Sequence, residues 1–182
     1  MKPHGYSDEA IVLARRNYGE ADRILVVFSK HHGKLSLMAK GVRRPKSRKR
    51  GHIEVFNKIS FGAAQGRALD IMTEAEVVDP FAEIKQSLRK VSLAYYMMEV
   101  IGKTTHEESV HPEVYEFLAD NLEKLKTAKL LKNLRLKFIK DLLVLLGFWP
   151  KGKELIDPDA QIKEIVERNI NSIRIGKMLS ED

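Results

Sequence analysis

The chemistry-bearing feature of this sequence is a run of basic residues. Between Lys40 and Arg50, seven of eleven residues are Lys or Arg and none is acidic. Because the segment carries no carboxylates of its own, only water or an external polyanion can neutralise it. A chain of phosphates suits such a cluster, since each contact releases a condensed counterion. The run predicts a nucleic-acid contact, and the alternative is a solvated loop without a ligand.

Single-strand binding also needs aromatic platforms on which bases stack. Tyr18 is the candidate, because Phe28, Phe56 and Phe61 are expected in a barrel core. Binding through backbone phosphates predicts little sequence preference. The predicted DNA-binding residues are one tyrosine and eleven cations: Arg15, Arg16, Tyr18, Arg23, Lys34, Lys40, Arg43, Arg44, Lys46, Arg48, Lys49 and Arg50.

A second basic segment runs from Lys124 to Lys140 without an acidic residue, and an apolar stretch follows it. One interpretation is an amphipathic helix with a basic exterior. The other is a groove with basic rims for an acidic, hydrophobic peptide. Its predicted partner-binding residues are Lys129, Lys132, Lys140, Phe148 and Trp149.

Catalytic motifs are absent from the sequence. There is no phosphate loop, no G-x-S-x-G, no H-E-x-x-H and no G-x-G-x-x-G. The lack of cysteine excludes disulfides, thiolate metal sites and cysteine nucleophiles. His31 and His32 are interpreted as solvated turn residues, and a magnesium-dependent nuclease built on Asp8, Glu9, Glu20 and Asp22 is the weak alternative. We expect no enzymatic activity, no metal and no cofactor.

The net charge of +7 is concentrated in the first half of the chain. Residues 1–80 hold 15 Lys and Arg against 9 Asp and Glu (+6), whereas residues 81–182 hold 17 against 16 (+1). This asymmetry predicts a polyanion partner for the first half, although charge alone also fits an anionic membrane surface. No apolar run is long enough to span a bilayer and the start lacks a leader's apolar region, so we expect a cytoplasmic, nucleoid-associated protein.

The elements that position these residues are short strands followed by helices. Strands are predicted at Glu9–Arg16, Arg23–Lys30, Lys34–Val42, Ile53–Phe61 and Leu69–Val77. Five such strands match a small barrel of the OB or SH3-like type. The basic run is then the connection between the third and fourth strands, beside the face on which OB-folds hold single strands.

Helix signals begin at Asp79-Pro80. Apolar residues three and four apart predict a helix to about Gly102, and others follow from His111-Pro112, over about residues 128–146, and from Asp157-Pro158 to about Asn169. The predicted fold class is α+β. A five-stranded OB-fold barrel occupies residues 1–79 and an all-α helical domain occupies residues 80–182.

Three stretches resemble landmarks of the bacterial DNA repair protein RecO family. They are Arg16–Arg23, Gly33 with Ala39–Arg44, and Leu146–Pro150, and the likeness spans roughly residues 6 to 150. The resemblance implies an OB-fold that binds single- and double-stranded DNA, joined to a helical domain. It also implies annealing of complementary strands, cooperation with RecR, contact with the acidic tail of single-stranded DNA-binding protein, and indirect help in loading the RecA recombinase.

The resemblance also implies roles for single residues. Arg23, Lys40 and Arg43 are the implied phosphate contacts, and the matching residues Tyr18, Glu20, Asp22, Gly33 and Gly41 complete the pattern, with Glu20, Asp22 and the glycines shaping the fold. Many family members carry a four-cysteine zinc module after the region of Gly147–Pro150, so this chain is expected to be a reduced variant without the zinc-binding cysteines. On the residues alone, an RNA-binding OB protein and a peptide-binding interaction module remain alternatives.

Overall fold

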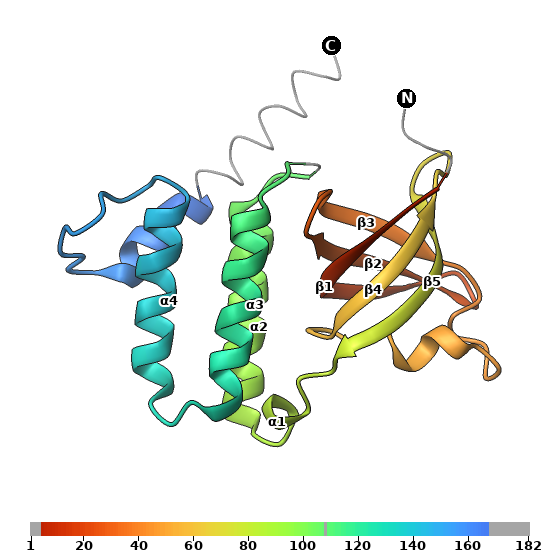
Figure 1. Cartoon of the computed structure of the whole chain (residues 1–182), viewed down its shortest axis with the longest axis horizontal. Coiled ribbons are helices and arrows are strands. Elements are labelled where there is room, and N and C mark those ends of the chain that lie inside the picture. Colours follow the sequence, from red (N-terminus) through yellow and green to blue (C-terminus); the bar gives the residue numbers. More distant parts are fainter. Residues whose placement is uncertain (1–4, 108, 168–182) are drawn as a thin grey trace, which may run out of the picture.

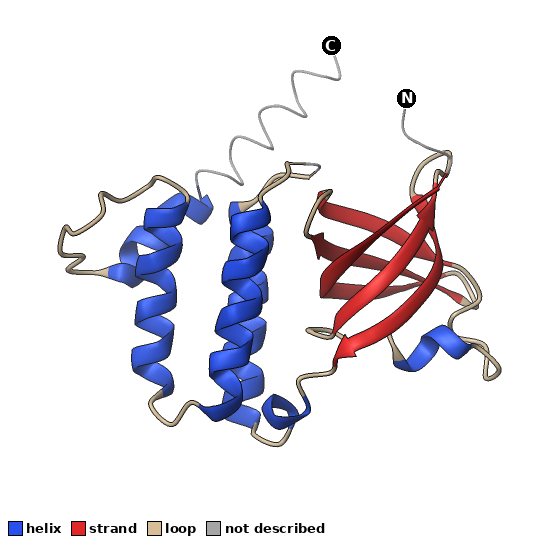
Figure 2. Cartoon of the chain, viewed as in Figure 1, coloured by secondary structure: helices blue, strands red, loops and turns tan. Residues whose placement is uncertain are grey.

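The structure is a computed structural model that describes residues 5–107 and 109–167. Five strands come first: β1 (Gly5–Tyr18), β2 (Asp22–Ser29), β3 (Gly33–Ala39), β4 (Lys58–Ala64) and β5 (Asp70–Asp79). They close into a barrel in the order β1-β2-β3-β5-β4 (Figures 1 and 2). All neighbours are antiparallel except β3 and β5, which are parallel. This is the OB-type barrel that the sequence predicts.

Alternating side chains fill the barrel. Along β3, Leu35, Leu37 and Ala39 are buried while the residues between them are half-buried, as a strand with one inward face requires. Phe61 from β4 and Met72 from β5 complete the same inner core. The two-residue period of the apolar side chains therefore sets which face of each strand points inward.

The helices follow the barrel. They are α1 (Ala82–Lys85), α2 (Leu88–Thr104), α3 (Pro112–Thr127) and α4 (Leu131–Leu145), and residues 158–167 are also helical. Figure 2 shows them gathered on one side of the barrel. The predicted end of the last helix at Asn169 lies outside the described residues. No helix in the described part of the chain combines the length and apolarity needed to cross a membrane.

Several element boundaries differ from the prediction, and β3, for example, ends at Ala39 and not at Val42. The fourth strand begins at Lys58, because residues 53–57 turn through Phe56, whose φ is 56°, and the Phe56 N–H donates to the Val12 carbonyl. The first helix is broken between α1 and α2. Tyr18 is the last residue of β1, and a 3-10 helix over Arg48–Gly51 within the basic run was not predicted.

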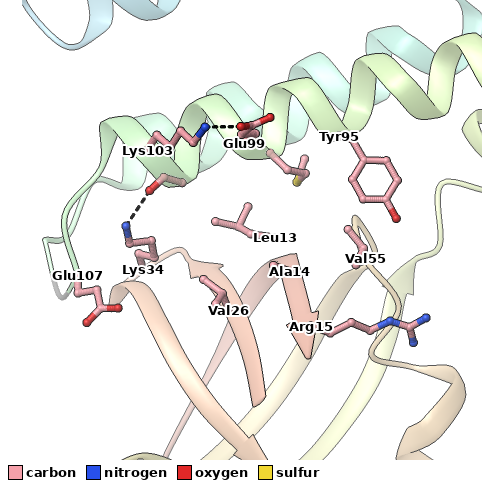
Figure 3. Close-up of a pocket in the computed structure, with 12 residues that line it drawn as sticks. Leu13, Ala14, Arg15, Val26, Lys34, Val55, Tyr95, Glu99, Lys103 and Glu107 are labelled. Carbon is pink, nitrogen blue, oxygen red and sulfur yellow. Dashed lines mark hydrogen bonds and ion pairs between the residues drawn. The ribbon is translucent and has the colours of Figure 1, made fainter. Parts of the chain in front are cut away.

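Lys34 ties the barrel to α2. Its ammonium donates to the carbonyl oxygens of Gly102 and Thr105, both at 2.7 Å, and Figure 3 shows one of these bonds, from Lys34 to α2. Because carbonyls at a helix C-terminus lack intrahelical partners, the lysine satisfies them and its charge complements the helix dipole. Gly33 packs close to Ser109, and a Cβ at Gly33 would lie 2.2 Å from the Ser109 carbonyl oxygen. The β2–β3 turn is therefore built to touch the helical part.

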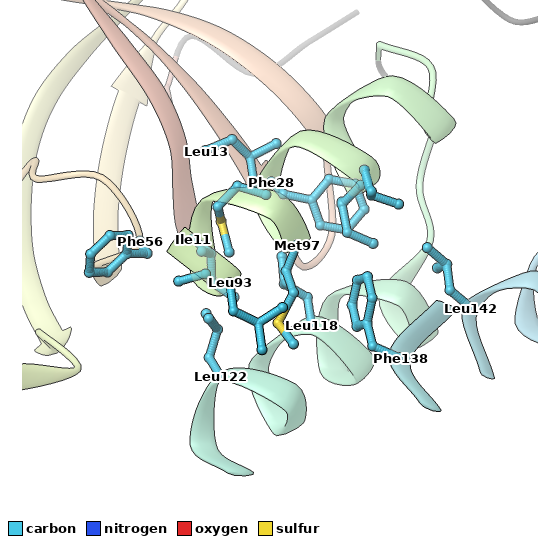
Figure 4. Close-up of a cluster of buried hydrophobic side chains, with 14 of the residues drawn as sticks. Ile11, Leu13, Phe28, Phe56, Leu93, Met97, Leu118, Leu122, Phe138 and Leu142 are labelled. Carbon is cyan, nitrogen blue, oxygen red and sulfur yellow. The ribbon is translucent and has the colours of Figure 1, made fainter. Parts of the chain in front are cut away.

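A second hydrophobic core joins the barrel to the helices (Figure 4). Ile11, Leu13 and Phe28 from β1 and β2 contribute to it, together with Phe56, and they pack with side chains of α2, α3 and α4. Burial of all three phenylalanines is confirmed, but only Phe61 is inside the barrel. Phe28 and Phe56 lie outside it because the outer face of β1 and β2 is covered by helices.

Asp8 is a buried carboxylate at the centre of a polar cluster on the barrel. Its side chain is 2% exposed and accepts hydrogen bonds from the Ser29 hydroxyl and the His31 backbone N–H, while the rings of His31 and His32 face it through Nδ1 at 2.8 and 2.9 Å. Burial alone would raise the pKa of Asp8. The bonds from Ser29, His32 and His31 together outweigh burial and lower the pKa to about 2.

This cluster predicts a loss of stability in acid. The pKa of Asp8 is lower in the folded chain than in the unfolded chain, so its contribution of about 2 kcal/mol is present above about pH 4 and disappears as the pH falls toward about 2. Urea unfolding across this range should show the loss in the wild type, whereas Asp8→Asn should be less stable at pH 7 and lack this pH dependence. If the free energy of unfolding fell with pH in the same way for both proteins, the role given to Asp8 would be contradicted.

Candidate nucleic-acid interface

The basic loop, defined as residues 40–50, folds back onto the barrel. The Gly41 N–H donates to Asp22 at 2.7 Å, and the Arg43 N–H donates to the Ala21 carbonyl at 2.8 Å. Lys49 donates from Nζ to the carbonyl oxygens of Met72 and Thr73 on β5. The short orange helix of Figure 1 marks the loop on the side of the barrel away from α3 and α4. The loop is thus a shaped part of the barrel surface.

Four arginines converge near the β1–β2 hairpin. Burial lowers the pKa of the Arg23 guanidinium, and the charges of Arg15, Arg43 and Arg50 lower it further, against an opposing effect of Glu54. Arg15 pairs with Glu54 at 2.5 Å, and Arg23 Nη1 is buried without a hydrogen-bond partner in the part of the chain that the structure describes. The cluster therefore holds more positive charge than its own carboxylate balances, which favours an anionic ligand.

Six of the predicted residues, Arg50 among them, present exposed cations. None forms an ion pair with a carboxylate among the described residues, although Glu74 and Glu76 line the same hollow of about 660 Å³ as part of the basic loop. Such charges are available to phosphates. The six are Arg16, Lys40, Arg44, Lys46, Arg48 and Arg50.

A groove on the outer face of the barrel is lined by one of these cations, Lys40. We define the barrel groove by the lining residues Tyr18, Ile24, Met38, Lys40, Arg67 and Leu69, with their neighbours in the β4–β5 loop. Its volume is about 500 Å³, and Tyr18 is 54% exposed. An apolar floor with an aromatic ring and two cations at its edge can hold unpaired bases while the phosphates contact the basic side chains.

The sequence identified only part of this groove. Tyr18 and Lys40 were predicted, but Met38, Leu69 and Arg67 were missed. Met38 and Leu69 have ordinary apolar side chains, and Arg67 lies far from the basic run in the sequence. The usable signal was the glycine-containing β4–β5 loop, because the equivalent loop takes part in ligand binding in many OB-folds.

Lys34 does not belong to this surface. Its ammonium is bound to the C-terminus of α2, and burial lowers the pKa of Lys34. The geometry therefore supports a structural role, in place of the predicted phosphate contact.

The two lysines Lys34 and Lys40 provide a matched test. Lys34→Met should lower the free energy of unfolding by about 1–3 kcal/mol, because two helix-end carbonyls lose a charged donor. Its affinity for a single-stranded oligonucleotide should stay within about twofold. Lys40→Met should weaken oligonucleotide binding and leave the free energy of unfolding nearly unchanged, since Lys40 is exposed at the groove. Weaker binding by Lys34→Met at unchanged stability would refute the assignment.

The predicted partner-binding residues lie in the helical part. Lys129, Lys132 and Lys140 are exposed and make no carboxylate pair within the described residues. Phe148 is 45% exposed, and Trp149 donates from Nε1 to the Lys153 carbonyl while its ring faces the Lys153 ammonium. The structure does not gather them into one patch, because Lys129 and Lys132 lie at the start of α4 and Phe148 and Trp149 follow its end, about 22 Å away along the helix.

The histidine pair is solvated and lies in the β2–β3 turn as interpreted, with the side chains of His31 and His32 64% and 39% exposed, but the pair also has a carboxylate partner. Both rings face Asp8, so a carboxylate that lies more than twenty residues away in the sequence orients them. Among residues 5–107 and 109–167, no group of three or more His, Asp or Glu side chains is placed to hold a metal ion.

Comparisons with known proteins place the chain among recombination proteins. The model described as "Recombination protein O N terminal" matches residues 1–81, and the model described as "Recombination protein O C terminal" matches residues 85–155. The DNA repair protein RecO of Dehalococcoides mccartyi is 32% identical over 84% of this chain and 60% of its own length. That of Pelotomaculum thermopropionicum is 37% identical over 66% of this chain and 47% of its own length.

The chain spans about half to three fifths of the length of these relatives. The two family models together cover the barrel and the helices α2 to α4. This chain therefore belongs to the recombination protein O family.

Proposed function

We propose that this chain binds single-stranded DNA on its barrel and acts in DNA repair and recombination as a non-enzymatic mediator that anneals complementary strands. The observation that carries the proposal is the set of six exposed cations without carboxylate partners among the described residues. Of these, Lys40 lines the barrel groove, and three more, Arg44, Lys46 and Arg48, line the hollow against β5. The relatives are named DNA repair proteins, which supports DNA as the polymer. We place the activity in the cytoplasm, at the nucleoid.

The geometry suggests how the polymer would bind. Phosphates contact the basic loop, and unpaired bases enter the groove beside Tyr18. A duplex hides its bases, so it gains the phosphate contacts without the stacking. We therefore expect both forms of DNA to bind, with single strands preferred and little dependence on base sequence.

Annealing follows from charge neutralisation. Two complementary strands repel each other through their phosphates, and a cationic surface that holds both lowers this repulsion and raises their encounter rate. The protein then needs no covalent step. The two DNA strands complete the reaction by forming base pairs with each other.

The helical part is proposed to contact partners. The family resemblance favours the acidic tail of single-stranded DNA-binding protein as the ligand of Lys129, Lys132, Lys140, Phe148 and Trp149. An extended acidic tail could follow the exposed lysines along α4 and reach the exposed Phe148 beyond its end. We also propose cooperation with RecR and an indirect effect on RecA loading. The separation of residues 1–79 as a DNA-binding domain and residues 80–182 as a helical domain belongs to the same proposal.

The function is tested by strand annealing with labelled complementary oligonucleotides, bare and coated with single-stranded DNA-binding protein. We expect faster annealing with the protein than without it, and intact strands after incubation with magnesium or manganese. Binding without any acceleration, or clean strand cleavage, would contradict the proposal. Matched DNA and RNA oligonucleotides separate it from an RNA-binding function, which predicts tighter binding to the strand with 2′-hydroxyls.

A further inference from the structure

The outer face of β1 and β2 continues beyond the barrel groove. The strand register pairs Arg16 with Ile24 and Ala14 with Val26, so these side chains share one face of the sheet. Ile24 lines the barrel groove, whereas Ala14 and Val26 line a separate pocket. Arg16 is exposed between the two. At about 3.3 Å per residue, the four residues from Tyr18 to Ala14 cover only about 13 Å.

The second pocket, which we call the barrel–helix cleft, lies between this face and α2 (Figure 3). Its volume is about 640 Å³. Leu13, Ala14 and Val26 form the strand side, and Tyr95 and Met98 form the helix side. The cleft is therefore a mostly apolar space that adjoins the outer surface of the barrel.

The two ends of the cleft differ. Figure 3 shows Arg15, Val55 and Tyr95 at one end and Lys34 with Glu107 at the other. The Lys34 end is closed by the bonds to α2, and on the helix side Glu99 is paired with Lys103. The Arg15 end adjoins the arginine cluster near the β1–β2 hairpin. An anionic chain would thus approach from the Arg15 end.

Tyr95 has the properties of a stacking platform. Tyr95 is 50% exposed. Its ring makes an edge-to-face contact with the ring of Phe56, with centroids 5.7 Å apart. A ring that is fixed on one edge and open to solvent elsewhere loses little entropy when a base stacks on it.

We propose that the barrel–helix cleft is a second base-binding site for the same single strand. The strand leaves the barrel groove, passes Arg16, and places an unpaired base against Tyr95 with its phosphates on Arg15 and the arginine cluster. The inference rests on the proposed function, and it extends the bound track from the barrel onto α2. A track of this kind holds a strand at two points and leaves the stretch between them exposed for pairing.

The length of the oligonucleotide tests this proposal. With an oligothymidylate of about 12 nucleotides, Tyr95→Ala should weaken binding at least about fivefold. With one of about 4 nucleotides, which the barrel groove alone can hold, affinity should not change. Tyr95→Phe should bind like the wild type, because it keeps the ring. Leu88→Ala is the matched control, since Leu88 is 82% exposed on the same helix and does not line the cleft.

Photocross-linking locates the base directly. Oligonucleotides that carry one 5-iododeoxyuridine at successive positions should cross-link to Tyr18 from some positions and to Tyr95 from others. Cross-links to Tyr18 without any to Tyr95, or equal affinity of Tyr95→Ala for the long oligonucleotide, would overturn the second site and leave the proposed function intact. If the wild type binds no oligonucleotide of either length, both fail.

Discussion

Replacing Arg44, Lys46, Arg48 and Arg50 together with Gln is expected to weaken binding to single-stranded DNA about 10²- to 10³-fold at about 0.1 M salt. Each of the four is exposed and forms no carboxylate pair within the described residues, so each is available to one phosphate. Four lost contacts should reduce the slope of log affinity against log salt by about 3. Fluorescence anisotropy titrations at several salt concentrations measure both quantities.

A charge-matched variant is the control. Gln at Lys124, Lys129, Lys132 and Lys140 removes the same net charge from exposed positions of the helical part. On bare oligonucleotides this variant should keep most of the affinity and the slope of the wild type, because a surface more than a Debye length from the strand contributes little. Equal losses for the two variants would show that net charge, and not the basic loop, controls binding.

Phe28→Ala is expected to lower the free energy of unfolding by about 3–5 kcal/mol. Phe28 is 0% exposed and lies in the core that β1 and β2 share with the helices (Figure 4). Removing its ring leaves a cavity between the barrel and the helices, so both parts should lose stability together. Urea unfolding followed by the fluorescence of Trp149, the single tryptophan, and by circular dichroism should give coincident transitions.

Phe61→Ala is the comparison for this experiment. Phe61 is also buried, but it lies in the inner core of the barrel. If the two halves unfold as one unit, both variants should shift the Trp149 transition. A Trp149 transition that Phe61→Ala leaves unchanged would show that the helical part is stable by itself and that the shared core couples the two halves only weakly.

The sequence predicted the barrel because its information is local. Leu35, Leu37 and Ala39 alternate as a strand with one buried face must, and glycine and polar residues mark the turns. The segment Ile53–Phe61 misled this reasoning, since its apolar residues suit a strand. Val55 and Phe56 are apolar because they pack toward the helices, and a period of two cannot distinguish that contact from a barrel interior.

The candidate site was predicted only where its residues are close in sequence. The basic loop is one continuous run, and its charge alone suggested phosphate. Lys34 was assigned to the same surface because nothing local shows that it meets the end of α2. Arg67 and Tyr95 were missed for the opposite reason, since each becomes meaningful only when the fold brings it to the barrel groove or the barrel–helix cleft.

Hydrogen–deuterium exchange of the full chain, with and without an oligothymidylate of about 12 nucleotides, tests the central proposal that the strand lies on the barrel. Bound DNA should slow exchange at residues 40–50 and 65–71 and leave α4 unchanged. Protection confined to α3 and α4, with the basic loop exchanging as in the unbound protein, would contradict it.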